Sequence, residues 1–140
     1  LPTYNSAKFI AEAIQSILDQ TYTNFELVII DDGSTDDTQQ ILKSFSDPRI
    51  INIKKKHTGL VDSLNYGLKI AKYDLIARMD ADDISMPKRL EKQFGFMEEH
   101  LEFAFCGTTA KTINDVGKEI SFFKPPTDSS KILALLLYRR

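Results

Sequence analysis

This sequence of 140 residues has very little cysteine and no long apolar run. The single cysteine, Cys106, excludes a disulfide bond within the chain and is typical of a reducing compartment. The longest apolar run, Ile132–Tyr138, is too short to cross a bilayer and predicts a buried helix instead. No signal peptide is recognisable. We therefore expect a cytoplasmic chain, whose association with the inner face of a membrane would be peripheral and made through regions outside this sequence.

A strong charge of one sign is also absent. The net charge is -2, so nothing indicates nucleic acid as a partner. Hydrophobic residues make up 42% and charged residues 27%, which suits one globular domain. A dinucleotide-binding Rossmann domain is not expected, because no G-x-G-x-x-G stretch occurs. The sequence opens without methionine and stops inside a helical pattern, so we expect a fragment of a longer protein.

Segments with the periodicities of strands and helices alternate along the chain. Short β-rich runs predict strands at residues 25–30, 49–53, 74–79 and 102–106. Residues 110–122 predict a hairpin that turns at Asn114–Gly117. One apolar face predicts helices from Asn5 or Ser6 to about Gln20, and near residues 38–45, 61–71 and 87–101. Ser34 and Asp37 have the spacing of a capping box. This order indicates an α/β fold with a largely parallel sheet.

Two acidic loops follow predicted strands. Asp31 and Asp32 come after the first run, and Asp80, Asp82 and Asp83 come after residues 74–79. Ligands bind at the carboxyl ends of parallel strands, so we expect these carboxylates to converge. A pair of like charges about 4 Å apart costs roughly 4 kcal/mol at an effective dielectric near 20. Mg²⁺ or Mn²⁺ would offset that cost, which predicts a seat for a metal and a diphosphate. Asp36 and Asp37 are expected only to favour a helix N-terminus.

The context of these loops carries a family resemblance. The stretches "LPTYN" at Leu1–Asn5, "SILDQTYTNFELVIIDDGSTDDT" at Ser16–Thr38 and "ARMDADDISMPKRLEKQ" at Ala77–Gln93 together resemble glycosyltransferase family 2, in the order of that family. The resemblance implies a GT-A fold, which is α/β, Rossmann-like and three-layered, with a mostly parallel sheet. Residues 1–140 would be the nucleotide-sugar-binding part, truncated at the C-terminus, with the acceptor-binding part missing.

The same resemblance implies a set of binding positions. Those for the nucleotide sugar are Pro2, Thr3, Tyr4, Asp31, Asp32 and Asp80. Asp80 and Asp82 would be the metal ligands for Mn²⁺ or Mg²⁺, with Asp82 the more direct ligand and Asp80 nearer the ribose. Asp32 would bond the base, usually uracil, and Asp31 would support its loop. The residue types agree, since a carboxylate accepts an N–H and Tyr4 offers a face for stacking. Tyr4 suits a core position equally well.

The implied reaction is sugar transfer from a nucleotide-diphosphate sugar, with a UDP-sugar expected. The acceptor would be a saccharide or a lipid-linked molecule in surface polysaccharide synthesis. The mechanism would be metal-dependent and inverting, with the catalytic base beyond Arg140. Leu64 stands where the family often has an arginine, and Lys54–Lys56 or His57 would have to replace any contact that this arginine makes.

Two other interpretations remain open from the sequence. Asp83–Pro87 resembles the D-x-x-M-P stretch of response-regulator receiver domains, and Lys124–Pro125 resembles their later K-P. A receiver, however, would leave the first helix and the D-A-D triplet without a role. A nucleotide-binding module without transferase activity is the other alternative.

Overall fold

The computed structural model describes residues 1–114, 116–128 and 130–132. The chain divides into two compact units, Leu1–Gly95 and Phe96–Arg140. The helix predicted at residues 132–138 lies, apart from Ile132, outside the described residues. The first unit is built on a parallel sheet with strand order β1-β2-β3, formed by β1 (Pro2–Thr3), β2 (Leu27–Asp31) and β3 (Ile50–Lys54).

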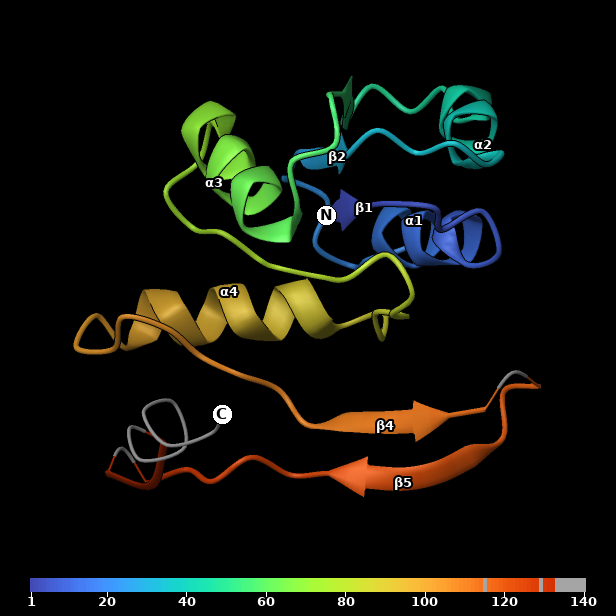
Figure 1. The fold of residues 1–140 in the computed structure, drawn as a ribbon. Helices are drawn as coiled ribbons and strands as arrows, with labels where there is room; N and C mark the ends of the chain where they lie inside the picture. Colours follow the sequence, from blue (N-terminus) through green and yellow to red (C-terminus); the bar gives the residue numbers. More distant parts are fainter. Residues whose placement is uncertain (115, 129, 133–140) are drawn as a thin grey trace. The chain divides into compact units, whose positions relative to one another are not determined.

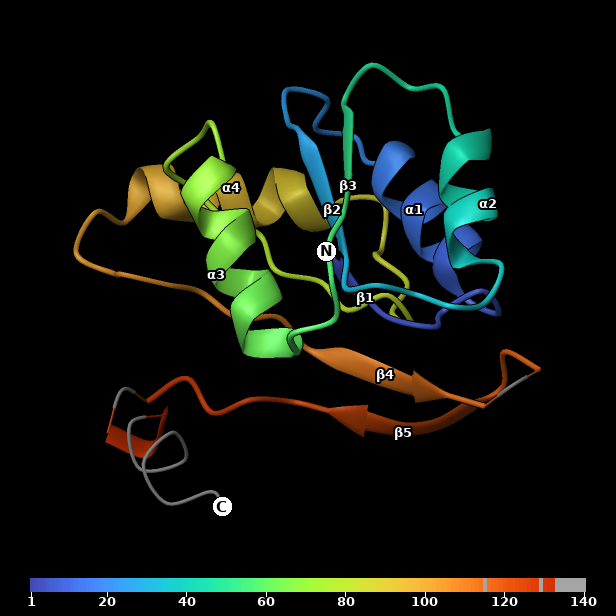
Figure 2. The same ribbon diagram turned by 45° about the horizontal axis from the view of Figure 1, so that its top comes forward.

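Helices cover both faces of this sheet, which gives the three layers expected from the sequence. Figures 1 and 2 show α1 (Ile10–Leu18) and α2 (Thr38–Ser44) on one face and α3 (Leu60–Ile70) on the other. A further helix, α4 (Arg89–Glu99), runs from the first unit into the second. The α/β fold with its parallel sheet is confirmed.

Side chains of β2 alternate between the two helical layers because successive residues of a strand point to opposite faces. Leu27 and Ile29 are buried with the apolar faces of α1 and α2, where Ile10 and Ile14 are fully buried. Ile30 is buried on the other face, and a Cβ at Gly67 of α3 would lie 3.7 Å from its Cγ1. Each such isoleucine contributes about 1.5–3 kcal/mol through its removal from water. Burial on both faces explains the unbroken apolar run in β2.

The strand predicted at residues 74–79 is wrong. The structure has no strand there, and Leu75 and Ile76 are exposed, whereas Met79 is buried in the core. A strand exists only through its pairing, and the β1 edge of the sheet is two residues long and begins with Pro2, which has no N–H to donate. An apolar β-rich run beside so short an edge has almost no ladder to join.

The second unit contains an antiparallel hairpin of β4 (Ala110–Ile113) and β5 (Glu119–Phe123). Its turn is the predicted one, since the N–H of Gly117 donates to the carbonyl of Asn114 at 2.9 Å and Gly117 has a φ of 77°. The strand predicted at residues 102–106 is absent. Among the described residues, no helix combines the length and the apolar character needed to cross a membrane.

Candidate functional site

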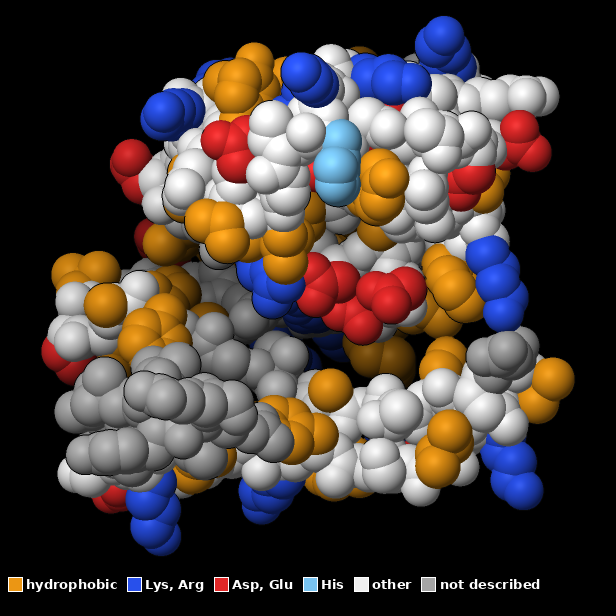
Figure 3. Space-filling model, viewed as in Figure 1, with side chains coloured by type: hydrophobic (Ala, Val, Ile, Leu, Met, Phe, Trp, Pro, Cys, Tyr) orange, Lys and Arg blue, Asp and Glu red, His pale blue; other side chains and the backbone are white. Residues whose placement is uncertain are grey.

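A cleft of about 500 Å³ opens beside the carboxyl ends of β1 and β2. Six of the seven predicted site residues line it, namely Pro2, Thr3, Tyr4, Asp32, Asp80 and Asp82. His57, Gly59 and Ser63, from the loop after β3 and from α3, complete one wall. Figure 3 shows acidic side chains gathered on this face of the molecule, with a histidine above them. The two acidic loops of the sequence therefore meet at one cavity.

Asp31, the seventh predicted residue, does not line the cleft. It is fully buried toward α2, where its Oδ1 accepts the hydroxyl of Ser34 at 2.5 Å and its Oδ2 accepts Nε2 of Gln39 at 2.6 Å. Asp32 points the other way, toward α3, because side chains alternate along the chain at the end of β2. Asp31 thus supports the loop, and Asp32 is the carboxylate presented to the cavity.

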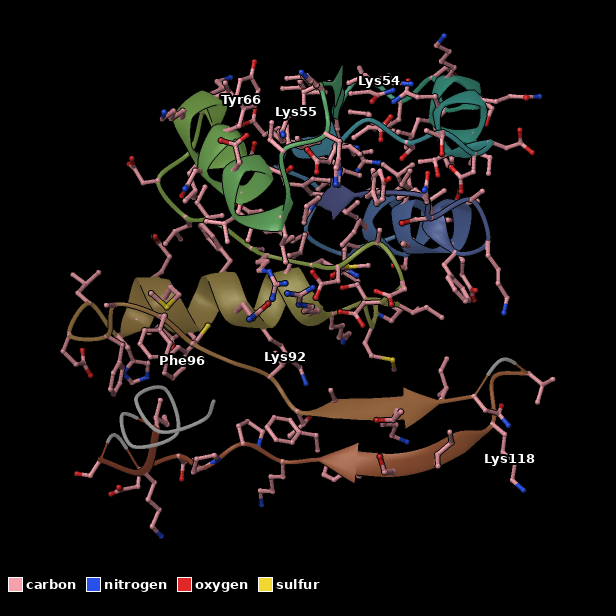
Figure 4. All side chains as sticks on the ribbon, in the orientation of Figure 1. Lys54, Lys55, Tyr66, Lys92, Phe96 and Lys118 are labelled. Atoms are coloured by element: carbon pink, nitrogen blue, oxygen red, sulfur yellow. The ribbon has the colours of Figure 1, made fainter. Side chains whose placement is uncertain are left out.

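Lys54 and Lys55, at the end of the neighbouring β3, repeat this alternation. Figure 4 shows them on opposite sides of the strand end. Nζ of Lys54 donates to the carbonyl of Ser34 at 3.1 Å, whereas Lys55 forms ion pairs with Asp32 and, at 3.1 Å, with Asp62 of α3. In this register Lys54 lies opposite Asp31. Lys54 therefore lies on the same face of the sheet as the carbonyl of Ser34, and Lys55 on the same face as Asp32.

Asp32 is held by donors from the N-terminus of α3. Its Oδ1 accepts the N–H of Thr58 at 3.0 Å, and its Oδ2 accepts the N–H of Gly59 at 2.8 Å. Burial by itself would raise the pKa of Asp32, but the hydrogen bonds from Lys55, Thr58 and Gly59 outweigh it and hold that pKa well below its usual range. The carboxylate is therefore ionised and fixed in position. The roles of Thr58 and Gly59 were not predicted from the sequence. These residues lie in the loop after β3, the strand next to β2, and loops at the carboxyl ends of neighbouring strands are where ligand-site residues are expected.

Tyr4 carries the aromatic surface of the cleft. Its side chain is 46% exposed, and the His57 ring stacks on it with a centroid separation of 4.2 Å and an interplanar angle of 28°. Nδ1 of His57 also lies 2.8 Å from Oδ2 of Asp32. Tyr4 is therefore a half-exposed residue of the cavity wall and not a core tyrosine.

The loop that carries Tyr4 is pinned to the loop after β2. Asn5 has a positive φ of 49°, its N–H donates to Oγ of Ser34 at 2.9 Å, and its Oδ1 accepts the N–H of Thr35 at 2.8 Å. The capping role predicted for Asn5 or Ser6 is wrong, because the residue before α1 is Phe9 and makes no side-chain cap. Through these contacts Ser34 and Thr35 of the "GSTDDT" stretch hold the loop of Tyr4 in place at the cleft.

The capping box predicted for Ser34 and Asp37 is also wrong. Asp37 precedes α2 but makes no side-chain cap hydrogen bond, and the hydroxyl of Ser34 is taken by Asp31. Oδ1 of Asp36 instead accepts the N–H of Thr38 at 3.0 Å, while its Oδ2 accepts the N–H of Ala7 at 3.1 Å. Short polar side chains hydrogen-bond to whichever backbone group the tertiary fold brings within reach. The capping-box spacing therefore predicted the wrong hydrogen-bond partners.

The close approach of the loops after β2 and β3 requires a glycine at position 33. Gly33 has a φ of 79°, and a Cβ there would lie 2.9 Å from the backbone nitrogen of His57 and 3.2 Å from the carbonyl oxygen of Lys55. No L side chain fits without moving backbone atoms. The glycine between the acidic pair and Ser34 therefore sets how near His57 comes to Asp32.

The carboxylates of the acidic triplet have different surroundings. Asp80 is paired with Arg78 at 2.6 Å, whereas Asp82 has no hydrogen-bond or ion-pair partner within the part of the chain that the structure describes. Asp83 does not belong to the lining of the cleft. Burial, followed by the charges of Asp80 and Asp82, raises the pKa of Asp83. Asp82 is thus the carboxylate left available for a cation or a ligand.

The segment after the triplet is anchored to α1 and to Gln20, which follows that helix. Gln20 is buried, its Nε2 donates to the carbonyl of Met86 at 2.8 Å, and its Oε1 accepts the N–H of Leu90 at 2.9 Å. The N–H of Ser85 donates to Oγ of Ser16 at 3.0 Å. Ser85 and Met86 of the "DISMP" stretch are therefore held in place by contacts with Ser16 and Gln20.

The fit of this site to a divalent cation rests on two carboxylates. Asp80 and Asp82 both line the cleft and offer the oxygen ligands that Mg²⁺ and Mn²⁺ prefer. Over residues 1–114, 116–128 and 130–132, no group of three or more His, Cys, Asp or Glu side chains is arranged to hold a metal. The residues fit a cation whose remaining ligands come from water and from a bound diphosphate, as is common for Mg²⁺.

Comparisons with known proteins agree with this geometry. A model of the family described as "Glycosyl transferase family 2" matches residues 1–130. The O-antigen biosynthesis glycosyltransferase WbnJ of Escherichia coli is 37% identical over 137 residues, which cover 94% of this chain and 52% of WbnJ. The uncharacterized glycosyltransferase MJ1057 of Methanocaldococcus jannaschii is 37% identical over 130 residues, which cover 89% of this chain and 45% of that protein.

A solved structure also matches the fold. Residues 1–349 of TarS from S. aureus, crystallised in complex with UDP, superimpose with a TM-score of 0.67 at 31% identity, covering 71% of this chain and 31% of that one. The present chain spans about half the length of WbnJ and MJ1057. A receiver domain is excluded by these matches, and the α/β architecture is similar to that of TarS.

Proposed function

The chain belongs to glycosyltransferase family 2, and from that premise we propose that its cleft binds the nucleotide-diphosphate sugar donor of a transfer reaction. The observation that carries the proposal is the meeting of Tyr4, Asp32 and Asp82 around one cavity. These groups supply an aromatic face, a fixed carboxylate acceptor and a carboxylate that has no partner among the residues that the structure describes. The aromatic face suits stacking of the base, and the fixed carboxylate suits the N–H of that base. The other carboxylate suits the metal that accompanies a diphosphate.

The base is the part of the donor that we assign to Tyr4 and Asp32. An ionised carboxylate accepts an N–H donor, and uracil presents one such N–H between two carbonyl groups. Stacking on Tyr4 would hold the ring plane beside that carboxylate. The UDP bound to TarS, a structure that this chain resembles, supports uracil as the base. We therefore propose a UDP-sugar as the donor.

The diphosphate is the part that we assign to the acidic triplet. Asp82, with Asp80 beside it, would hold Mn²⁺ or Mg²⁺, and phosphate oxygens would complete the coordination. When bound, the cation supplies Lewis-acid stabilisation of the diphosphate leaving group. Without it, Asp80 and Asp82 would repel the phosphates. The ion pair with Arg78 keeps Asp80 in place and reduces its charge toward the cleft.

The complete protein would transfer the sugar by direct displacement at the anomeric carbon, with inversion. A carboxylate base beyond Arg140 would take the proton of the acceptor hydroxyl, and the acceptor would be a saccharide or a lipid-linked molecule of surface polysaccharide synthesis. The O-antigen biosynthesis role in the name of WbnJ supports this acceptor class. We expect the reaction to take place in the cytoplasm, at the inner face of the membrane when the acceptor is lipid-linked.

Calorimetric titration of UDP and ADP in the presence of Mn²⁺ tests the proposal. UDP should bind more tightly than ADP. Asp32→Asn keeps the side-chain shape, removes the charge, and should abolish most of that preference. A hydrogen bond to a charged group contributes about 1.5–3 kcal/mol, so the loss for UDP should be roughly tenfold or more. Far-UV circular dichroism checks that the variant is folded. Equal binding of UDP and ADP by the parent protein would refute the assignment of the base.

A nucleotide-binding module without transferase activity is the second candidate. It predicts the same titrations, because both candidates share this cleft. Incubation of the full-length protein with UDP-sugars and an acceptor extract, followed by detection of released UDP, separates the two.

A further inference from the structure

The side chain of His57 lies in the position that the proposed nucleobase needs. Its ring stacks on Tyr4, with centroids 4.2 Å apart and an interplanar angle of 28°. Its Nδ1 lies 2.8 Å from Oδ2 of Asp32 and 3.0 Å from the backbone oxygen of the same residue. Both neighbours of this nitrogen are acceptors, so Nδ1 is the protonated nitrogen and donates. A flat heteroaromatic ring with one N–H directed at Asp32 is what a uracil base would also present.

The contact between His57 and Asp32 is not needed to satisfy the carboxylate. Oδ2 of Asp32 already accepts the N–H of Gly59 at 2.8 Å, and Oδ1 accepts the N–H of Thr58 at 3.0 Å as well as the ammonium group of Lys55. Each oxygen of Asp32 would therefore keep at least one donor if the imidazole left, and the acceptor position on Oδ2 would become open to another N–H. The His57 side chain is 56% exposed and has room to rotate toward solvent.

We propose that His57 occupies the base subsite as an internal substitute for the nucleobase, and that the donor enters by displacing it. This inference rests on the proposed function, since it concerns the same subsite. The imidazole and the base compete for one aromatic face and one carboxylate, so only one of them occupies the subsite at a time. His57 thereby keeps Tyr4 and Asp32 in register before the donor arrives and lowers the apparent affinity for it.

The size of the effect follows from the contacts that the base must replace. When only a fraction of the molecules has an open subsite, the apparent dissociation constant equals the intrinsic constant divided by that fraction. One net hydrogen bond alone corresponds to a factor of about 2–10 in such an equilibrium, and the stacking contact adds to it. Removal of the imidazole should therefore tighten binding of the nucleoside several-fold.

Calorimetric titrations of the full-length protein, of His57→Ala and of His100→Ala test the inference. His100 is the matched control, because it is the other histidine and also packs against an aromatic ring, that of Phe96, at 4.5 Å. UDP and uridine should each bind His57→Ala several-fold more tightly than the parent, and His100→Ala should match the parent. Inorganic diphosphate should bind the parent and His57→Ala equally, because the contacts of the imidazole within the described residues are with Tyr4 and Asp32 and not with the acidic triplet.

The outcomes separate this inference from the proposed function. Unchanged or weaker UDP binding by His57→Ala overturns the displacement model, and so does an equal gain for diphosphate. Failure of both proteins to bind UDP overturns the proposed function and this inference with it. A spectroscopic measurement on the parent is independent of any variant. The imidazole proton resonances of His57 should move when UDP is added, as the ring leaves Tyr4, whereas a stationary signal under saturating UDP would also overturn the model.

Discussion

Replacing Gly33 by alanine should destabilise the chain and disturb the cleft at the same time. Gly33 has a φ of 79°, which costs an L residue about 1–2 kcal/mol. The new methyl group would also lie 2.9 Å from the backbone nitrogen of His57, and no flexible side chain is there to yield. Overpacking of this kind typically costs about 1–3 kcal/mol. The two contributions together predict a loss of roughly 2–5 kcal/mol in the free energy of unfolding.

Two other glycines of the same unit separate these contributions. Gly59 has a φ of 99°, but a Cβ there would meet nothing within 4 Å, so Gly59→Ala should carry the conformational cost alone, about 1–3 kcal/mol. Gly67 lies inside α3 with ordinary contact at 3.7 Å from Ile30, so Gly67→Ala should be neutral or stabilise by about 0.5–1 kcal/mol. Gly67→Ala should therefore be the most stable of the three variants, Gly59→Ala intermediate and Gly33→Ala the least stable.

Urea unfolding followed by circular dichroism measures the series, with the parent as reference. UDP titration of the same variants reports on the cleft, where Gly33→Ala should weaken binding because it displaces the loop that positions Asp32. An alanine at position 33 that unfolds at the same urea concentration as the parent would refute the close packing of the loops after β2 and β3.

Three further predictions concern charge. Mn²⁺ and UDP should strengthen each other's binding by the same factor, with a coupling of about 1–3 kcal/mol in calorimetry. Asp82→Asn should remove most of this coupling. The control Asp37→Asn should leave it unchanged, because Asp37 is an exposed acid that makes no capping hydrogen bond. Acetyl phosphate with Mg²⁺ should leave Asp83 unmodified in a mass spectrum, and a stoichiometric aspartyl phosphate there would contradict the assignment of this chain to a transferase and not to a receiver domain. Hydrogen bonds from Arg49 lower the pKa of Asp47 to about 2, so this pair stabilises the folded chain above about pH 4, the unfolded value, and loses its effect as pH falls toward about 2. The difference in urea midpoint between Asp47→Asn and the parent should therefore be largest at about pH 6 and shrink as pH falls toward about 2. A difference that does not change with pH would refute this pairing.

The elements that were predicted correctly from the sequence are those whose apolar residues pack against one another within the first unit. β2 and α1 form as expected because Ile29, Ile10 and Ile14 bury one another. The run at residues 74–79 has the composition of a strand, but a strand also needs an edge to pair with, and the edge of β1 is two residues long. Composition reports the preference of a segment and says nothing about whether its partner exists.

The candidate site was predictable in outline and not in its contacts. The opposite directions of Asp31 and Asp32 follow from strand alternation, a rule that is available from the sequence alone. The donors that hold Asp32 come from Thr58 and Gly59, whose backbone N–H groups carry no sequence signal. The stacking of His57 on Tyr4 depends on how two loops approach each other, which only the folded chain determines.

A crystal structure of the full-length protein with UDP and Mn²⁺ would show whether this cleft is the donor site. We expect the uracil ring on Tyr4 with its N–H directed at Asp32, the His57 ring rotated out of that position, and the cation between Asp82 and the diphosphate. UDP bound away from these residues, or within the cleft but with its diphosphate remote from Asp80 and Asp82, would contradict the proposed donor site.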